Sequence, residues 1–88
     1  MVYISKGVEK VAVAEVEDAK ALQAALNDNN CIDAVVRQDI IGKDLAAGFV
    51  VCFDSYEIKA IEQRDAETIL HWLITLGVND VLVRRYEI

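Results

Sequence analysis

The chain has 88 residues, of which 55% are hydrophobic, and its 15 acidic and 9 basic residues give a formal net charge of −6. This length predicts one domain spanning residues 1–88. The acidic balance argues against direct binding of nucleic acid, whose phosphates attract clustered Lys and Arg. The sequence contains neither an apolar run of about 20 residues, which would predict a membrane span, nor a secretory signal at its N-terminus. We therefore expect a cytoplasmic protein without a membrane partner.

The first 41 residues predict two strands, a helix and a third strand. A turn near Gly7 separates the first two strands, and Asp18 can cap the helix. The helix ends at a strong turn signal in residues 27–30. The segments with the composition of strands are residues 2–4, 11–14 and 35–36. The narrow apolar stripe of the helix consists of Ala19, Leu22, Ala25 and Leu26.

A second series of the same elements is predicted in residues 48–88. Asp65 can cap its helix, and Gly77 stands where a left-handed residue would end that helix. A turn at Gly42-Lys43-Asp44 is expected between the two halves. Strands are expected at residues 49–53 and 81–83. The apolar stripe of the second helix consists of Ala66, Ile69, Leu70, Leu73 and Leu76.

Residues 54–63 allow two interpretations. Asp54 and Glu57 could form a capping box that begins a helix. The alternation of apolar and polar side chains from Tyr56 to Ala60 is instead typical of a strand. This segment also aligns with the strand at residues 11–14 when the sequence is shifted by 47 positions, and we therefore predict a strand.

The chain resembles itself at an offset of 47 residues. This single offset aligns the two helix caps, the two helix stripes and the strands without a gap, which is typical of duplicated supersecondary units. We predict pseudo-repeats over residues 1–41 and 48–88, each with the order strand, turn, strand, helix, strand. The residues that are identical to the residue 47 positions later are Glu15, Asp18, Ala19, Leu26, Asp33, Val36, Arg37 and Ile41.

These elements predict an α+β fold in which an antiparallel sheet carries two helices on one face. The core βαββαβ order is that of ferredoxin-like folds, here built from two ββαβ pseudo-repeats. The short N-terminal strand adds to this plan, so the sheet could have more than four strands.

The sequence offers no pattern of catalytic or metal-binding residues, and we predict no catalytic residue, cofactor or metal site. Cys31 and Cys52 lack the CxxC spacing of a metal or redox site, and we expect buried thiols. His71, the single histidine, falls on the polar face of the second helix and has no metal or nucleophile motif beside it. Glu15 and Glu62 could bind a cation or act as an acid/base pair if the fold brings them together. The interpretation that we favour is that each stabilises a helix N-terminus.

Arg37 and Arg84 are equivalent in the repeat and alternate away from the residues expected to face the helices. Two arginines and a tyrosine among aliphatic side chains on the open side of a sheet are typical of a binding surface. Ion pairs of the arginines with Asp33, Asp39 or Asp80 are the structural alternative, and Trp72 is either a core residue or an interface anchor. RNA binding is a minor option because aromatic stacking positions are few. The predicted interface residues are Val35, Arg37, Val50, Cys52, Trp72, Leu82, Arg84 and Tyr86.

Three classes of function remain, led by a small non-enzymatic protein that regulates a partner by binding to it. A narrower hypothesis is a virus-encoded inhibitor, of the anti-CRISPR or another anti-defence type, acting in the host cytoplasm. Its acidic surface would compete with nucleic acid for a basic channel. The alternative is a small-molecule-sensing domain with a ligand at a helix–sheet or subunit boundary, and an enzyme ranks last.

The apolar share of the chain also predicts self-association. A domain of this size cannot hide so many apolar side chains in one core, and a large exposed patch is rare on monomers. We expect a twofold homodimer, or a permanent protein partner, on the open face of the sheet. The competing explanation is that the extra strand or a curled sheet buries these residues within one chain.

Overall fold

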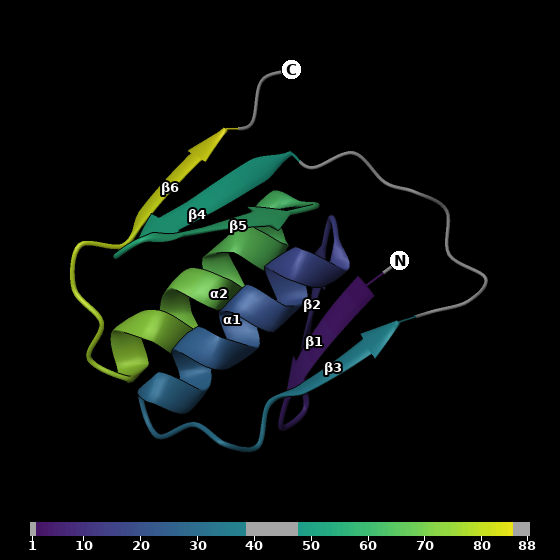
Figure 1. Ribbon diagram of the computed structural model, residues 1–88. Coiled ribbons are helices and arrows are strands. Elements are labelled where there is room, and N and C mark those ends of the chain that lie inside the picture. The colour runs from purple at the N-terminus through teal and green to yellow at the C-terminus, as the bar shows by residue number, and fades with distance from the viewer. Residues whose placement is uncertain (1, 39–47, 86–88) are drawn as a thin grey trace.

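A computed structural model describes residues 2–38 and 48–85 of the chain. Within these residues the fold is α+β, with a six-stranded antiparallel sheet and two helices (Figure 1). The strand predicted at residues 56–60 is confirmed. The strands are β1 (Val2–Lys6), β2 (Glu9–Val13), β3 (Val35–Gln38), β4 (Phe49–Phe53), β5 (Tyr56–Ala60) and β6 (Leu82–Arg85), and the helices are α1 (Val16–Asp28) and α2 (Gln63–Thr75).

The strands follow one another across the sheet in the order β3-β1-β2-β5-β4-β6. Each hairpin, β1–β2 and β4–β5, pairs over five residues. The hairpins meet at β2–β5, where the Cα register in the described residues is the single pair Val13–Ala60. We call this junction the seam. The ferredoxin-like order is not confirmed, because β1 lies between β2 and β3, and β4 lies between β5 and β6.

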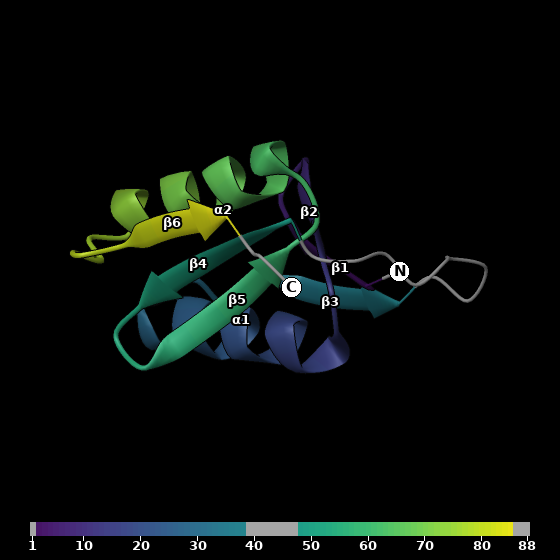
Figure 2. The same ribbon diagram turned by 90° about the horizontal axis from the view of Figure 1, so that it is seen from above.

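Both helices cover the same side of the sheet, which bends around them. Figure 1 shows α1 and α2 between strands β4–β6 above and strands β1–β3 to the right, and Figure 2 shows the same enclosure from above. The face opposite the helices therefore lies on the outside of the bend. The largest fully buried side chains come from four strands and both helices: Ile4, Val11, Val13, Leu22, Leu26, Val51, Ile58, Ile69, Trp72 and Leu73.

The described elements of the two halves share one spacing. Every element of residues 48–85 begins and ends 47 positions after its counterpart in residues 2–38. The strand registers have the same spacing, because the pair Val2–Val13 corresponds to Phe49–Ala60. The sheet order is likewise symmetric about the seam. The predicted turn at residues 42–44, and Ile41, Tyr86 and Ile88, lie outside the described residues.

The helices begin three residues earlier than predicted. Their N-cap residues are Glu15 and Glu62, whereas Asp18 and Asp65 occupy the third helical position. From that position a carboxylate reaches back to the N-cap amide. The N–H of Glu15 donates to Asp18 Oδ2 at 3.0 Å, and the N–H of Glu62 donates to Asp65 Oδ2 at 3.1 Å. The aspartates thus mark the first turn of each helix rather than its boundary.

The second oxygen of each aspartate binds the other half of the chain. Asp18 Oδ1 accepts the N–H of Lys59 in β5 at 3.1 Å, and Asp65 Oδ1 accepts the N–H of Ala12 in β2 at 3.2 Å. In a regular antiparallel ladder these amides would donate to carbonyls across the seam. The carboxylates replace those carbonyls where the two strands diverge. We call the two arrangements the carboxylate clips.

Backbone hydrogen bonds complete the seam. The N–H of Ala14 donates to the Lys59 carbonyl at 2.9 Å, and the N–H of Ile61 donates to the Ala12 carbonyl at 3.2 Å. Each strand therefore donates once to the other strand and once to a carboxylate from the other half. The seam depends on the clips for half of these four bonds.

Trp72 belongs to the core. Its side chain is 1% exposed and packs with the buried residues of both helices. Its indole Nε1 has no hydrogen-bond partner within the described residues. This burial removes Trp72 from the predicted interface, because an anchor must present its ring to a partner.

Left-handed residues follow both helices, as predicted for Gly77, which has a φ of 91°. The residue 47 positions earlier, Asn30, has a φ of 69°. Asn is one of the few residues besides Gly that adopts this conformation readily. Both helices therefore end by the same backbone device with different side chains.

The carboxylate clips predict that the two aspartates stabilise the fold more than their position in a helix would indicate. Asp18→Ala and Asp65→Ala should each lower the free energy of unfolding by about 1–3 kcal/mol, because each leaves two partly buried amides without their acceptor. Chemical denaturation measures this loss. Asp28→Ala is the matched control, since Asp28 is exposed on the last turn of α1, and it should change stability by less than about 0.5 kcal/mol. Equal effects at all three positions would contradict the role of the clips.

Candidate functional site

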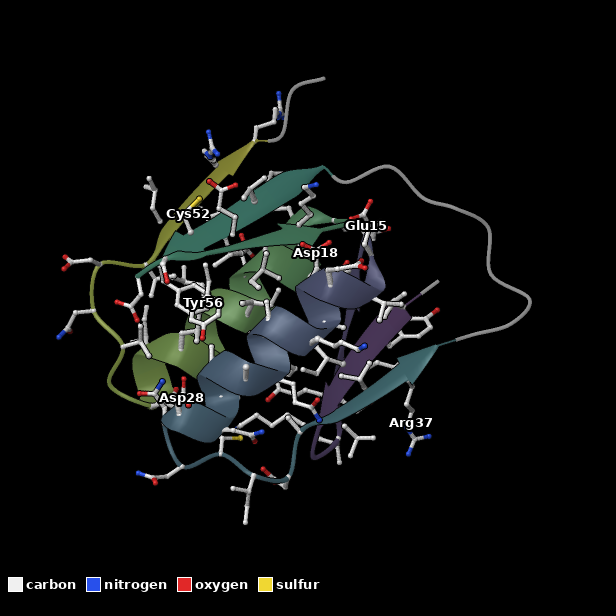
Figure 3. All side chains as sticks on the ribbon, viewed as in Figure 1. Glu15, Asp18, Asp28, Arg37, Cys52 and Tyr56 are labelled. Atoms are coloured by element: carbon white, nitrogen blue, oxygen red, sulfur yellow. The ribbon has the colours of Figure 1, made fainter. Side chains whose placement is uncertain are left out.

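The face of the sheet opposite the helices is the surface that the strands present outward, and we call it the open face. Strand alternation places two side chains of each strand on it. Six of the predicted interface residues lie there, and Figure 3 shows Arg37 and Cys52 pointing away from the helices. The residues of the open face are Tyr3, Ser5, Lys10, Ala12, Val35, Arg37, Val50, Cys52, Glu57, Lys59, Leu82 and Arg84.

The open face is basic in an acidic protein. Its charged side chains are four bases and one acid, which sum to +3. Since the whole chain carries −6, all other residues together carry −9. The open face therefore has the opposite sign of charge to the chain as a whole. The open-face charges are Lys10, Arg37, Lys59, Arg84 and Glu57.

Apolar side chains accompany these bases at both edges of the sheet. Val35 on β3 is 48% exposed and Leu82 on β6 is 61% exposed. Val50 is 2% exposed although it lies on the open face, where it stands between Lys59 and Arg84 of the neighbouring strands. Val50 therefore offers a partner almost no surface, and Cys52 is half-buried.

The ion pair that the structure shows for the two arginines has a different partner from those predicted. Arg84 lies 3.7 Å from Glu57 Oε1, and both side chains are more than half exposed. An exposed pair of this kind contributes little to stability. Asp33 instead accepts a hydrogen bond from the Cys31 thiol at 3.1 Å, and Asp39 lies outside the described residues. The arginines therefore have little structural role to account for them.

Tyr3 lies between two bases of the open face. It is opposite Arg37 in the β1–β3 register, and Lys10 Nζ lies 4.5 Å from the centroid of its ring. This distance is within the range of a cation–π interaction. Tyr3 and Lys10 are not among the predicted interface residues. The period-two alternation of residues 2–6 and 9–13 would have placed both on the open face once the hairpin register was known.

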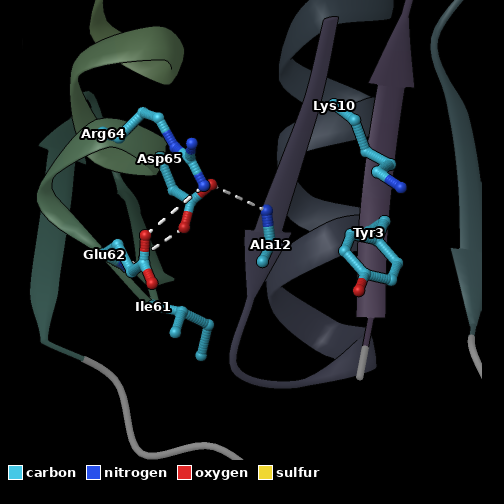
Figure 4. Close-up of a pocket in the computed structure, with 7 residues that line it drawn as sticks. All are labelled: Tyr3, Lys10, Ala12, Ile61, Glu62, Arg64 and Asp65. Carbon is cyan, nitrogen blue, oxygen red and sulfur yellow. Dashed lines mark hydrogen bonds and ion pairs between the residues drawn. The ribbon is translucent and has the colours of Figure 1, made fainter. Parts of the chain in front are cut away.

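A pocket of about 300 Å³ opens where the seam ends beside the start of α2 (Figure 4). In the view of Figure 4, Tyr3 and Lys10 lie on one side and Glu62, Arg64 and Asp65 lie on the other. Arg64 lies 3.5 Å from Glu62 Oε2. The residues lining the pocket are Tyr3, Lys10, Ala12, Ile61, Glu62, Arg64 and Asp65.

Glu15 and Glu62 do not form a site together. The antiparallel strands cross at Val13–Ala60, so the chain continues from there in opposite directions to the two glutamates. Each glutamate is the N-cap of a helix. A paired acid/base or a shared cation therefore has no geometric basis.

The other residues considered for catalysis or metal binding do not line the pocket. His71 is exposed on α2. No cluster of three or more His, Cys, Asp or Glu side chains that could hold a metal occurs in residues 2–38 and 48–85. Over the same residues, neither helix is long and apolar enough to cross a membrane.

The two thiols occupy different environments. Cys31 is 6% exposed, and burial, together with its hydrogen bond to Asp33, raises the pKa of its thiol. The same hydrogen bond lowers the pKa of the Asp33 carboxyl. Cys52 is half-buried on the open face. Cys31 is thus kept in the protonated, unreactive form.

Burial also raises the pKa of the Asp18 carboxyl, while the hydrogen bonds from the amides of Lys59 and Glu15 lower it in part. The carboxylate pays a desolvation cost inside the seam, and its two amide donors offset some of that cost. Asp18 is 6% exposed, as is Asp65.

Comparisons with protein-family models, with curated proteins and with solved structures found no match.

The thiol environments predict unequal reactivity. With an aromatic disulfide reagent at neutral pH, Cys52 should react at least about tenfold faster than Cys31, because reaction requires an accessible thiolate. The variants Cys31→Ser and Cys52→Ser assign the two phases. Equal rates in the folded protein, or a faster Cys31, would contradict the assigned environments.

The raised pKa of Asp18 predicts the sign of one pH effect. The native state then keeps a proton at a pH where the unfolded chain has lost it, so the contribution of Asp18 to the unfolding free energy falls as pH rises through that window. Carbon NMR should show the Asp18 carboxyl titrating above the value in an unstructured peptide of the same sequence. The stability difference between wild type and Asp18→Ala should narrow as pH rises through the same window. If the Asp18 carboxyl titrated below the pKa measured in the peptide, its contribution to the unfolding free energy would instead rise with pH, which would contradict the prediction.

Proposed function

We propose that this chain is a small non-enzymatic regulatory domain that binds an acidic protein partner on its open face. The observation that carries the proposal is the +3 charge of this face on a chain of −6, combined with exposed Val35 and Leu82. Apolar side chains beside charges of one sign are typical of a surface that binds a complementary partner. The bases lie on four different strands, which suits a broad contact more than a single reaction centre.

The charge of the open face favours a different partner over a second copy of the chain. Two copies that met through this face would bring two surfaces of +3 together, and like charges in contact are destabilising. A homodimer through the open face remains an outcome of the experiment. Light scattering at micromolar concentration distinguishes a 9.8 kDa monomer from a species of twice that mass.

A second candidate uses the opposite side of the molecule. The described residues outside the open face sum to −7, and Glu17, Asp28 and Glu67 among them are exposed on the helices. An inhibitor that competes for a basic nucleic-acid channel would bind through this acidic side. The two proposals therefore assign the contact to opposite sides of the chain.

The proposal includes a duplicated architecture with pseudo-repeats over residues 1–41 and 48–88. It is supported by the common spacing of 47 residues in every described element and register. In an experimental structure, Asp18 should superpose on Asp65 and Arg37 on Arg84. Different backbone environments for the two arginines would contradict the duplication.

The docking face can be tested with matched substitutions. Arg37→Glu and Leu82→Glu should each weaken binding to a purified partner at least about tenfold, because they place a carboxylate against an acidic surface. Lys20→Glu and Ile74→Glu are the controls on the helices, since Lys20 is exposed and Ile74 is 58% exposed. The partner is recovered by cross-linking and mass spectrometry from cells that express the chain naturally, and affinity is then measured calorimetrically.

The outcomes separate the two candidates. Loss of binding in the open-face variants with retention in the helix variants supports the acidic partner. Unchanged binding in the open-face variants with stronger binding in the helix variants supports the inhibitor of a basic channel, because the added carboxylates attract a basic partner. Binding that is unaffected by all four substitutions would contradict both.

A further inference from the structure

We infer that the pocket at the end of the seam binds a small anion that carries a carboxylate or phosphate group. This inference concerns a ligand of the chain by itself and does not depend on a protein partner. The pocket lies at a helix–sheet boundary between β1, β2 and the start of α2 (Figure 4). Its volume of about 300 Å³ is at the lower end of the range for small-molecule sites.

The equivalent end of the seam serves as an internal comparison. Because every described element recurs after 47 residues, each residue of the pocket has a counterpart where β5 meets the start of α1. Residues that are the same at both ends are explained by the fold. Residues that differ between the two ends are not required by the fold. Such a residue can serve a function that only one end has.

The acidic residues of the pocket are the same at both ends of the seam. Glu62 and Asp65 correspond to Glu15 and Asp18, and each pair supplies an N-cap and a carboxylate clip. Both oxygens of Asp65 accept backbone amides. Glu62 forms an ion pair with Arg64. The acids of the pocket therefore already have partners.

Five of the seven lining residues differ from their counterparts. Two of these differences do not favour an anion, because Ile61 replaces Ala14 and Ala12 replaces Lys59. The charged side chains of the lining nevertheless sum to zero, against −3 at the other end of the seam, and three differences suit an anion. Tyr3, Lys10 and Arg64 of the pocket replace counterparts that are aliphatic or acidic. The change adds an aromatic ring with a hydroxyl and turns two acidic positions into two bases. The counterparts at positions 50, 57 and 17 are Val50, Glu57 and Glu17.

The geometry places these groups around one space. Tyr3 and Lys10 come from the β1–β2 hairpin, whereas Arg64 comes from the first turn of α2. All three line the same cavity. The structural interactions of the two bases are an exposed ion pair for Arg64 and a ring contact for Lys10. Neither interaction uses the full set of donors on these side chains, so both bases can still donate to an anion.

The lining also limits the size and chemistry of the ligand. Ala12 and Ile61 supply apolar surface, and the Tyr3 ring supplies one wall. A small organic anion would place its charged group between the bases and its carbon skeleton against this surface. Carboxylate and phosphate share the chemistry that Arg and Lys recognise, and the experiment distinguishes between them.

Amide NMR of the folded chain tests the inference directly. Inorganic phosphate and citrate are titrated separately at ionic strength held constant with sodium chloride. We expect at least one of them to cause saturable shifts of the amides of Lys10, Ala12, Arg64 and Asp65. The amides of Glu17 and Lys59, at the other end of the seam, should not shift. Saturation by phosphate or by citrate alone identifies which anionic group the pocket prefers.

Matched variants decide whether the bases cause the binding. Lys10→Gln and Arg64→Gln should each weaken affinity about tenfold, since each removes a charge-assisted hydrogen bond. Both side chains are exposed, so the fold should be preserved, as the remaining amide spectrum will show. Lys20→Gln removes an exposed base from α1 and should leave the affinity unchanged.

Three results would overturn the inference. They are the absence of saturable shifts with both anions, shifts that spread equally over Lys20 and the pocket, and unchanged affinity in both Gln variants of the pocket. None of these results depends on the acidic protein partner, so the two proposals fail separately.

Discussion

The carboxylate clips hold the two halves of this chain together. Each helix begins with an aspartate that binds its own N-cap amide with one oxygen and a strand of the other half with the second. The seam between the hairpins has one register pair in the described residues, so strand pairing alone would join the halves weakly. The clips also place the first turn of each helix beside the opposite hairpin, and Asp65 lines the pocket at that point.

A carboxylate suits this position better than other small polar side chains. Both of its oxygens accept hydrogen bonds, whereas an amide side chain would present one acceptor and one donor to two amides. The cost is desolvation, which burial of Asp18 makes visible as a raised pKa. Two backbone donors and the positive charge of Lys59 offset part of that cost. The two aspartates are accordingly the buried charged residues of the described chain.

The sequence predicted the elements better than their arrangement. Alternation identified the strand at residues 56–60, and the residue spacing placed both helices. The helix starts were wrong by three residues, because Asp18 and Asp65 are good N-cap residues in isolation and their second partner lies far along the chain. Strand order was not predictable for the same reason, since it depends on contacts across the seam. Tyr3 and Arg64 reach one pocket from separate elements, and no local pattern indicates that meeting.

The 47-residue spacing shared by the described elements separates structural residues from residues with another role. The clips, the N-caps and the left-handed helix ends recur in both halves, and their conservation within the chain is explained by folding. Tyr3 and Lys10 differ in residue type from the residues 47 positions later, Val50 and Glu57. Both belong to the open face and to the pocket. An anion held at Lys10 would reduce the positive charge that an acidic partner meets. The two proposed ligands would then oppose each other, and each would weaken the other by the same factor.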